Sequence, residues 1–332
     1  MKLKDSYERE IRDLRISLTD RCNFRCFYCL PSSKPTLNQK ANILTFEEIA
    51  DLSSIFVELG IDKIRLTGGE PLLRKNITTL IAMLAKLRTS TNRLDIALTT
   101  NGYLFPETAF ELRAAGLDRV TLSLDSLRRE RFTEITGVDG LDKVYESIEA
   151  AKRVGLDPVK INAVVVRGRN EDELADFAGF ARDYNVKMRL IEFMPLDSDD
   201  NWRRDLVVTG REMFNSINVQ FPLELIGTTR GSGTSWRYRF RDGAPGEIGI
   251  IAPVSEMFCG QCSRIRLTAD GQIRTCLFSR VEHDLREAKR EGATRAELIG
   301  LIRAAVEKKE PRHYINDPDF EPASRSMSFI GG

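Results

Sequence analysis

"LTDRCNFRCFYCLP", residues 18–31, brings three cysteines within eight residues: Cys22, Cys26 and Cys29. The chain has six cysteines in 332 residues, and the other three form a second group far downstream: Cys259, Cys262 and Cys276. Cysteines used as small buried apolar residues would be scattered among the apolar segments. Because every thiol here belongs to one of two triplets, the pattern indicates bound metal.

A disulfide framework is one alternative, but it is typical of short secreted chains. The N-terminal "MKLKDSYERE" has no apolar signal segment, and no later run is long and apolar enough to suggest a membrane span. We therefore expect a cytoplasmic protein with reduced, metal-bound thiolates.

Zinc is the second alternative, since a structural zinc site needs four ligands. The chain has two histidines, His283 and His313, which we interpret as surface residues. His283 could still complete a zinc site with the second cysteine triplet, so zinc remains an alternative metal for that triplet. The first triplet has no nearby fourth ligand, and a [4Fe–4S] cluster held by three thiolates leaves one iron open for chemistry.

The charges almost cancel, with 50 basic and 49 acidic residues. This balance argues against a nucleic-acid module or a membrane-surface protein, because neither a strong overall field nor a basic, aromatic-rich stripe is present. Any anionic ligand must therefore be bound by local basic residues. The length allows one large domain or two smaller ones.

Six apolar, β-rich runs alternate with helical patterns. The runs are "LRISLT" (14–19), "KIRLT" (63–67), "LDIALTT" (94–100), "RVTLSLD" (119–125), "VKINAVVV" (159–166) and "VKMRLIEFM" (186–194). The first helix is predicted to begin at Thr45, with Glu48 completing a capping box, and to end at Gly60. Such alternation favours parallel strands with right-handed crossovers. We expect an α/β fold, an open six-unit (β/α) partial barrel, over residues 1–195.

The pattern changes beyond residue 196. "SWRYRFRDG" alternates aromatic residues on one face, and "RIRLTADGQIRTCLF" predicts a hairpin that turns at Asp270 and Gly271. A further helix is predicted after Thr294. Residues 196–332 are therefore expected to form an α+β appendage that carries the second triplet and covers one end of the barrel.

In βα barrels the working residues lie at the carboxyl ends of the strands. The first triplet directly follows the first strand, and "TGGEP" ends the second. Consecutive glycines let the backbone approach a ligand closely, and Glu70 offers an acceptor for an ammonium group or a ribose hydroxyl.

The CxxxCxxC spacing, with the aromatic Tyr28 before the last cysteine and a GGE strand after it, resembles the radical S-adenosylmethionine enzymes. The resemblance implies that Cys22, Cys26 and Cys29 hold a [4Fe–4S] cluster whose open iron chelates the amino and carboxylate groups of S-adenosylmethionine. It also implies a cofactor pocket formed by Tyr28 at the adenine, Gly69 at the methionyl end, and Ser123 and Met194.

Within that superfamily the chain is similar, along nearly all of its length, to the family that cyclises GTP in the first step of molybdenum cofactor biosynthesis. The matching segments include "IRLTGGEPLLR", "VTLSLDSL", "IEFMPL", "GEIGIIAP" and a second triplet spaced CxxC, thirteen residues, C. The resemblance implies a lyase that makes 3′,8-cyclo-7,8-dihydro-GTP. A 5′-deoxyadenosyl radical abstracts the ribose 3′ hydrogen, and the sugar radical attacks carbon 8 of the guanine.

The same resemblance implies roles for particular residues. Cys259, Cys262 and Cys276 would hold a second [4Fe–4S] cluster facing the guanine. GTP would be contacted by Arg15, Arg65, Thr99, Lys160, Arg264 and Arg266, with Thr100 open as an alternative to Thr99. Gly331 and Gly332 would form a tail that reaches into the active site and acts there with Arg264 and Arg266. Independently, arginine and lysine suit a triphosphate, which carries about four negative charges.

The implied partners are GTP, a reductant protein such as flavodoxin or ferredoxin, and the cyclic pyranopterin monophosphate synthase that takes the product. A homodimer is compatible with the resemblance, whereas nucleic acid and membrane are not expected. The main competing function is another radical enzyme on the same fold, whose second cluster serves a different substrate. A zinc-binding scaffold is the competitor from another class.

Overall fold

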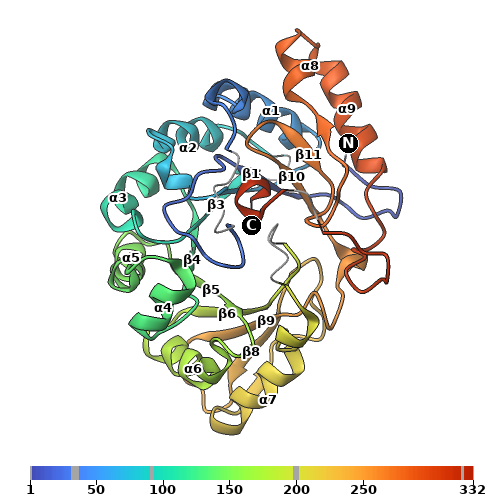
Figure 1. The fold of residues 1–332 in the computed structure, drawn as a ribbon. Helices are drawn as coiled ribbons and strands as arrows, with labels where there is room; N and C mark the ends of the chain where they lie inside the picture. Colours follow the sequence, from blue (N-terminus) through green and yellow to red (C-terminus); the bar gives the residue numbers. More distant parts are fainter. Residues whose placement is uncertain (1, 31–36, 90–92, 197–201, 323–324, 332) are drawn as a thin grey trace.

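The computed structural model describes residues 2–30, 37–89, 93–196, 202–322 and 325–331. Its first half alternates strands and helices. The strands are β1 (Asp13–Ser17), β2 (Lys63–Thr67), β3 (Asp95–Thr100), β4 (Arg119–Ser123), β5 (Lys160–Val165) and β6 (Lys187–Glu192). The helices are α1 (Phe46–Glu58), α2 (Ile77–Ala85), α3 (Phe105–Ala115), α4 (Arg129–Thr136), α5 (Leu141–Arg153) and α6 (Leu174–Asp183). Each of these six strands is parallel to the next, and the helices lie outside the curved sheet (Figure 1).

The second half adds strands to both ends of this sheet. Beside β6 lie β9 (Glu247–Ile251), β8 (Trp236–Phe240) and β7 (Leu223–Leu225), with α7 (Gly210–Gln220) on the outside. Beside β1 lie β10 (Arg264–Leu267), β11 (Gln272–Arg274) and β12 (His283–Asp284), followed by α8 (Arg286–Arg290), α9 (Arg295–Glu307) and α10 (Met327–Ile330). β10 is parallel to β1, and β9 is parallel to β6.

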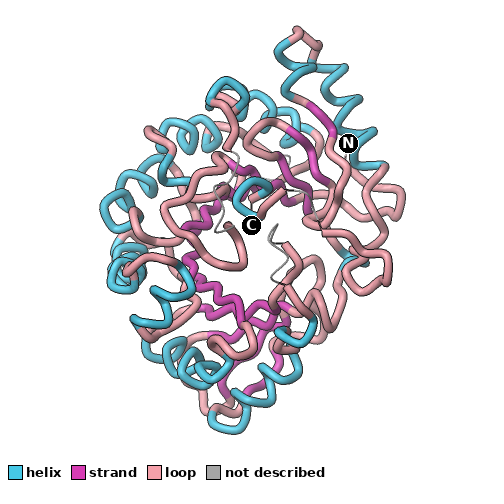
Figure 2. The backbone as a smooth tube through the Cα atoms, viewed as in Figure 1, coloured by secondary structure: helices cyan, strands magenta, loops and turns pink. Residues whose placement is uncertain are grey.

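The α/β class with a mostly parallel sheet is confirmed. The described strands form one sheet in the order β12-β11-β10-β1-β2-β3-β4-β5-β6-β9-β8-β7. The C-terminal region is therefore more than a cover over one end, because its backbone hydrogen bonds continue the sheet past both β1 and β6. Figure 2 shows the strands in a curved arrangement, with the C-terminal helix on its concave side.

Local sequence signals explain where the helices begin and end. Thr45 accepts from the Glu48 backbone N–H, while the Glu48 carboxylate accepts from Thr45, so the predicted capping box is present at α1. The same arrangement begins α9 at Thr294. The predicted hairpin turn also forms, since Gly271 has a φ of 81° between antiparallel β10 and β11.

Alternation along the strands separates the core from the interior of the curved sheet. Leu14, Ile16, Ile64 and Leu66 are fully buried in the main apolar core, which also contains the apolar faces of the surrounding helices. The residues between them have their side chains on the opposite face, because successive side chains of a strand alternate. That inner face carries the charged side chains of Arg15 and Arg65.

Candidate functional site

The first cysteine triplet lies in the loop that follows β1, at the carboxyl end of the parallel strands. Its turn is closed by hydrogen bonds from the Cys29 and Leu30 N–H groups to the Cys26 carbonyl, both 3.0 Å. The Phe24 N–H donates to Cys22 Sγ at 3.3 Å, and Asn101 Nδ2 lies 3.8 Å from the same sulfur. Burial raises the pKa of Cys22 to about 11 and that of Cys29 to about 12. Thiols buried side by side in this way need positive charge to ionise, and a metal cluster supplies it.

No three His, Cys, Asp or Glu side chains of the described residues gather closely enough to hold a single metal ion. A mononuclear zinc site is therefore not preformed. A cubane cluster differs because each thiolate binds a different iron, so the three sulfurs do not have to converge on one point.

The GGE segment locks the loops after β1 and β2 together. Gly69 N–H donates to the Thr19 carbonyl at 2.7 Å, and a Cβ on Gly69 would lie 2.2 Å from the Arg21 carbonyl oxygen. Only glycine allows this approach, which fixes the backbone directly before Cys22.

Glu70 is completely buried beside this loop. Its carboxylate accepts hydrogen bonds from Thr100 Oγ1 and the Asn101 N–H, both 2.8 Å, and from the Leu72 N–H at 3.0 Å. Burial raises the pKa of Glu70 to about 7. Because a carboxylate has about four acceptor positions, one remains for a ligand.

Tyr28 is held by a residue that sequence reasoning missed. Its hydroxyl donates to Asp125 Oδ2 at 2.5 Å, and Asp125 Oδ1 accepts from the Val164 N–H at 2.8 Å. Burial raises the pKa of Asp125 to about 6. The signal was available, since Asp125 follows β4 at the carboxyl edge where working residues are expected.

Three arginines occupy equivalent positions on adjacent strands. Arg15 of β1 is the register partner of Arg266 on β10 and of Arg65 on β2. Arg65 donates to the hydroxyls of Thr99 and Thr121, both at 3.1 Å. Arg15 Nε is buried and has no hydrogen-bond partner among the described residues. Like charges side by side repel each other, so this row favours an anion between the guanidinium groups.

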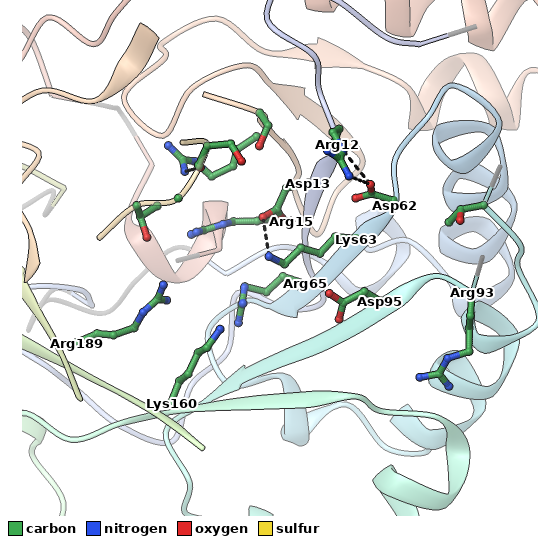
Figure 3. A pocket seen from close by; sticks show the side chains of 16 residues that line it. Arg12, Asp13, Arg15, Asp62, Lys63, Arg65, Arg93, Asp95, Lys160 and Arg189 are labelled. Atoms are coloured by element: carbon green, nitrogen blue, oxygen red, sulfur yellow. Dashed lines mark hydrogen bonds and ion pairs between the residues drawn. The ribbon is translucent and has the colours of Figure 1, made fainter. Parts of the chain in front are cut away.

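Arg15 and Arg65 line a cavity of about 480 Å³ at the amino-terminal side of the strands. The lining residues of the described chain include eight basic and three acidic side chains. Figure 3 shows Arg15, Arg65, Lys160 and Arg189 pointing toward a common space, while Arg12 pairs with Asp62 at the side. The basic side chains are Arg12, Arg15, Lys63, Arg65, Arg93, Lys160, Arg189 and Arg264.

The pKa values in this cavity reflect burial and an excess of basic over acidic side chains. Burial, followed by repulsion from neighbouring cations, lowers the pKa of Arg65 to about 9 and that of Arg189 to about 10. The same causes lower the pKa of Lys160 to about 7. A polyanion would reverse these shifts, because an opposite charge nearby favours the charged form of each cation.

The second triplet lines a neighbouring cavity of about 170 Å³, which also includes Arg15, Arg189 and Arg264 from the basic cavity. Burial raises the pKa of Cys262, but Arg264 and Lys309 outweigh this effect and lower it to about 7. Burial raises the pKa of Cys276. An electropositive setting of this kind suits thiolate ligands.

The two histidines differ from the sequence expectation. His283 on β12 is not among the residues that line this cavity, so the zinc hypothesis loses its proposed fourth ligand. His313 is only 6% exposed and does line it, so its interpretation as a surface residue was wrong. The neighbours of His313 in the sequence, Arg312 and Tyr314, do not indicate burial. The ring is buried because Phe278, which is distant in the sequence, packs against it.

The C-terminal tail lies between the two triplets. The Gly331 carbonyl accepts a hydrogen bond from Arg266, and Ile330 is fully buried. A Cβ on Gly331 would lie 2.8 Å from Thr67 Cγ2. Met327 lines the cavity of the second triplet, whereas a backbone hydrogen bond from Ser328 reaches Cys29 of the first. Gly332 lies outside the described residues.

The structure also places the remaining predicted residues. Thr99 accepts a hydrogen bond from Arg65, which lines the basic cavity, while Thr100 donates to the buried Glu70. Met194 lines the cavity of the second triplet. Ser123 ends β4 beside Asn162 of β5 and lines neither of these two cavities.

Arg189 is the most important basic residue that sequence reasoning missed. It lies on β6 as the register partner of Asn162, with which it shares the inner face. Its signal was the strand alternation in "VKMRLIEF", which places a charged residue between the fully buried Met188 and Leu190.

Two known protein families match successive parts of the chain. Residues 16–181 match the Radical SAM superfamily, and residues 186–315 match Molybdenum Cofactor Synthesis C. The crystal structure of Streptococcus suis SuiB bound to S-adenosylmethionine shares the fold, with a TM-score of 0.63 at 14% identity, over 97% of this chain and 76% of that one. Fold, cysteine loop and family match define the class of radical S-adenosylmethionine enzymes, with S-adenosylmethionine and an iron–sulfur cluster as cofactors.

Relatives with high sequence identity show which family within this class includes the chain. The GTP 3′,8-cyclase of Heliobacterium modesticaldum is 44% identical over 99% of both chains. That of Streptomyces coelicolor is 43% identical over 99% of this chain and 96% of its own. The chain belongs to the GTP 3′,8-cyclase family. None of the described helices is long and apolar enough to cross a membrane.

Proposed function

We propose that this protein converts GTP to 3′,8-cyclo-7,8-dihydro-GTP, the first step of molybdenum cofactor biosynthesis. The observation that carries the proposal is the row of Arg266, Arg15 and Arg65 on adjacent strands. Arg15 and Arg65 line the cation-rich cavity, while Arg15 and Arg266 line the adjoining cavity of the second cysteine triplet. A nucleoside triphosphate supplies the missing negative charge at one end and a flat base at the other. Family membership agrees with this assignment.

Two [4Fe–4S] clusters are part of the proposal. The first would be held by Cys22, Cys26 and Cys29, and the second by Cys259, Cys262 and Cys276. The donor sets fit, since each offers three thiols, and three thiolates leave one iron open. The first set comes from one loop, whereas the second combines two cysteines before β10 with one after β11. The open iron of the first would bind S-adenosylmethionine, and that of the second would face the guanine.

The cofactor pocket is proposed to comprise Tyr28, Gly69, Glu70, Ser123 and Met194. Because the Tyr28 hydroxyl already donates to Asp125, its ring and backbone are the parts left for the adenine. Glu70 has one acceptor position left and orders the loop through Thr100 and Asn101. Met194 lines the cavity of the second triplet, which supports a cofactor pocket next to the proposed substrate site.

GTP is proposed to contact Arg15, Arg65, Thr99, Lys160, Arg264 and Arg266, and we add Arg189 to this set. Guanidinium groups bind phosphate oxygens through paired N–H donors, which both neutralise and orient the triphosphate. Gripping the nucleotide at its phosphates and its base fixes the ribose between them. Bond formation between two carbons of one flexible molecule depends on this orientation.

When bound, a reduced [4Fe–4S] cluster held by Cys22, Cys26 and Cys29 would supply the electron that cleaves S-adenosylmethionine to methionine and a 5′-deoxyadenosyl radical. That radical would abstract the 3′ hydrogen of GTP, the ribose radical would attack carbon 8 of the guanine, and one further electron and one proton would complete the product. The chain's own residues hold the substrate and exclude water. Gly331 and Gly332 are proposed to act with Arg264 and Arg266, since the Gly331 carbonyl already accepts from Arg266.

We further propose that residues 1–195 form an open six-unit partial barrel and that residues 196–332 form an α+β appendage with the second cluster and the Gly-Gly tail. A reductant such as flavodoxin or ferredoxin and a downstream cyclic pyranopterin monophosphate synthase complete the proposed reaction sequence. A cytoplasmic location, with a homodimer as one compatible assembly, also belongs to this proposal.

The decisive experiment is an anaerobic assay of the reconstituted protein with S-adenosylmethionine, dithionite and GTP, with ATP as control. We expect 5′-deoxyadenosine to form and GTP alone to become a cyclised nucleotide. Deoxyadenosine without GTP consumption would favour the competing function, another radical enzyme of the same fold. No deoxyadenosine from protein that holds iron and sulfide would contradict the radical chemistry itself.

A further inference from the structure

His313 has a buried imidazole ring whose two nitrogens lack a well-formed hydrogen bond. Neither Nδ1 nor Nε2 meets the distance and angle of a hydrogen bond with any of the described residues, although the side chain is only 6% exposed. Burial lowers the pKa of His313, and the Pro253 backbone interacts with the ring only weakly, in the direction that raises it. An imidazole always carries at least one N–H donor, and an unsatisfied buried donor costs roughly 1–3 kcal/mol. Such a group indicates a partner that the polypeptide does not itself supply.

The surroundings of the ring identify where that partner lies. The His313 backbone N–H donates to Cys259 Sγ at 3.5 Å, and the ring lines the same cavity as the three cysteines of the second triplet. Phe278, two residues after Cys276, packs against the ring with a centroid distance of 5.2 Å. Phe320 supports Phe278 at 6.3 Å, so aromatic packing fixes the orientation of the imidazole.

Two other donors that line this cavity already have acceptors, whereas Arg15 Nε, which also lies on this lining, does not. Lys309 Nζ donates to the Thr275 carbonyl, and Arg266 donates to the Gly331 carbonyl. The ring of His313 is therefore a preplaced donor beside Cys259 that these contacts do not use. If it bound the open iron instead, it would occupy the position proposed for the guanine.

We propose that His313 donates a ring N–H to a sulfur atom of the second cluster and thereby orients that cluster and raises its reduction potential. This inference rests on the proposed function, which places a [4Fe–4S] cluster on the second triplet. Hydrogen bonds to sulfur favour the reduced, more negative cluster, and such outer contacts tune iron–sulfur potentials. His313 acts here as a positioning residue, because it works through the cluster.

The first test uses the full chain with Cys22, Cys26 and Cys29 changed to Ala, so that the signal comes from the second cluster alone. Potentiometric titration followed by EPR would compare His313→Leu, His313→Gln and the control His283→Leu. We expect the midpoint potential to become more negative in His313→Leu and to shift less in His313→Gln, which keeps an N–H donor. The midpoint potential in the control His283→Leu should not change, and neither should the iron content of any of these variants. An unshifted potential in His313→Leu would overturn the proposal.

The second test needs no His313 variant to fold. The chain has two histidines, so labelling with ¹⁵N-histidine reports on two residues. Pulsed EPR of the reduced second cluster should show one weakly coupled imidazole nitrogen, which persists in His283→Leu. Strong coupling would make the ring an iron ligand and overturn the proposal, as would the absence of any coupling.

Different results would contradict the proposed second cluster and the proposed role of His313. If the triple-alanine chain binds no iron, the second cluster of the proposed function is wrong, and this inference falls with it. A different result would leave the proposed function intact: iron binds and an iron–sulfur EPR signal is present, but the midpoint potential does not shift in His313→Leu and no imidazole nitrogen coupling is seen. In that case only the inference about His313 is wrong.

Discussion

Arg189 contributes a guanidinium group to a space that already holds Arg15 and Arg65. Replacing it by Gln in Arg189→Gln removes one charge-assisted contact to the triphosphate, which is worth about 1.5–3 kcal/mol. We expect GTP affinity to fall roughly tenfold or more. Calorimetric titration with GTP and with guanosine measures the effect, which should be confined to GTP.

Arg239→Gln is the matched control for this prediction, since Arg239 is an exposed arginine paired with Glu224 at 3.0 Å. It should leave GTP affinity unchanged. Equal losses for GTP and guanosine in Arg189→Gln would instead assign Arg189 to the base or to the fold.

Lys160 makes GTP binding depend on pH. Burial, followed by repulsion from Arg189, lowers the pKa of Lys160 to about 7, so at pH 8 the free protein carries it mostly neutral. Phosphate favours the charged form and raises that pKa, so binding takes up a proton. Affinity should therefore fall as pH rises above 7, by up to about tenfold per pH unit from this one group.

Calorimetry at pH 8 in two buffers of different ionisation enthalpy measures this proton uptake. We expect close to one proton for the wild type and almost none for Lys160→Arg, because arginine stays charged. Equal uptake in both proteins would show that another group titrates.

At the scale of elements, the contact between the loops after β1 and β2 depends on Gly69. In Gly69→Ala the new Cβ meets the Arg21 carbonyl and displaces the backbone before Cys22. We expect the first cluster to be lost and the second to remain, so that roughly half of the iron is retained after reconstitution. Iron and sulfide analysis with EPR provides the measurement.

Gly300→Ala is the control, because Gly300 lies within α9 and a Cβ there would meet no atom within 4 Å. Full iron content in Gly69→Ala would contradict the role of the close approach. Loss of both clusters would indicate a general folding defect instead.

Several elements were predictable because their signals are local. The capping boxes at Thr45 and Thr294, and the glycine turn at Gly271, depend on residues within a few positions of each other. The pairing of β10 with β1 was not predicted, since their residues are about 250 positions apart and no local pattern specifies that contact.

For the whole molecule, the shared sheet predicts that the two halves do not fold separately. A fragment of residues 1–195 would expose β1 and β6 as unpaired edges, because β10 and β9 are removed. We expect this fragment to aggregate, and co-expression with residues 196–332 to recover a single complex. Size-exclusion chromatography and thermal unfolding measure this outcome. A soluble 1–195 monomer with cooperative unfolding would contradict it.

The sequence by itself determined the βα alternation, the two cysteine triplets and the strand positions of Arg15, Arg65 and Lys160, because period, spacing and composition are local properties. Only the tertiary structure decided that Arg266 lies beside Arg15, that Thr99 rather than Thr100 bonds Arg65, and that Asp125 holds Tyr28. It also buried His313 beside Cys259. These contacts join parts of the chain that are distant in sequence. Their energies come from burial and charge in an interior that forms only when the sheet and the C-terminal tail are folded together.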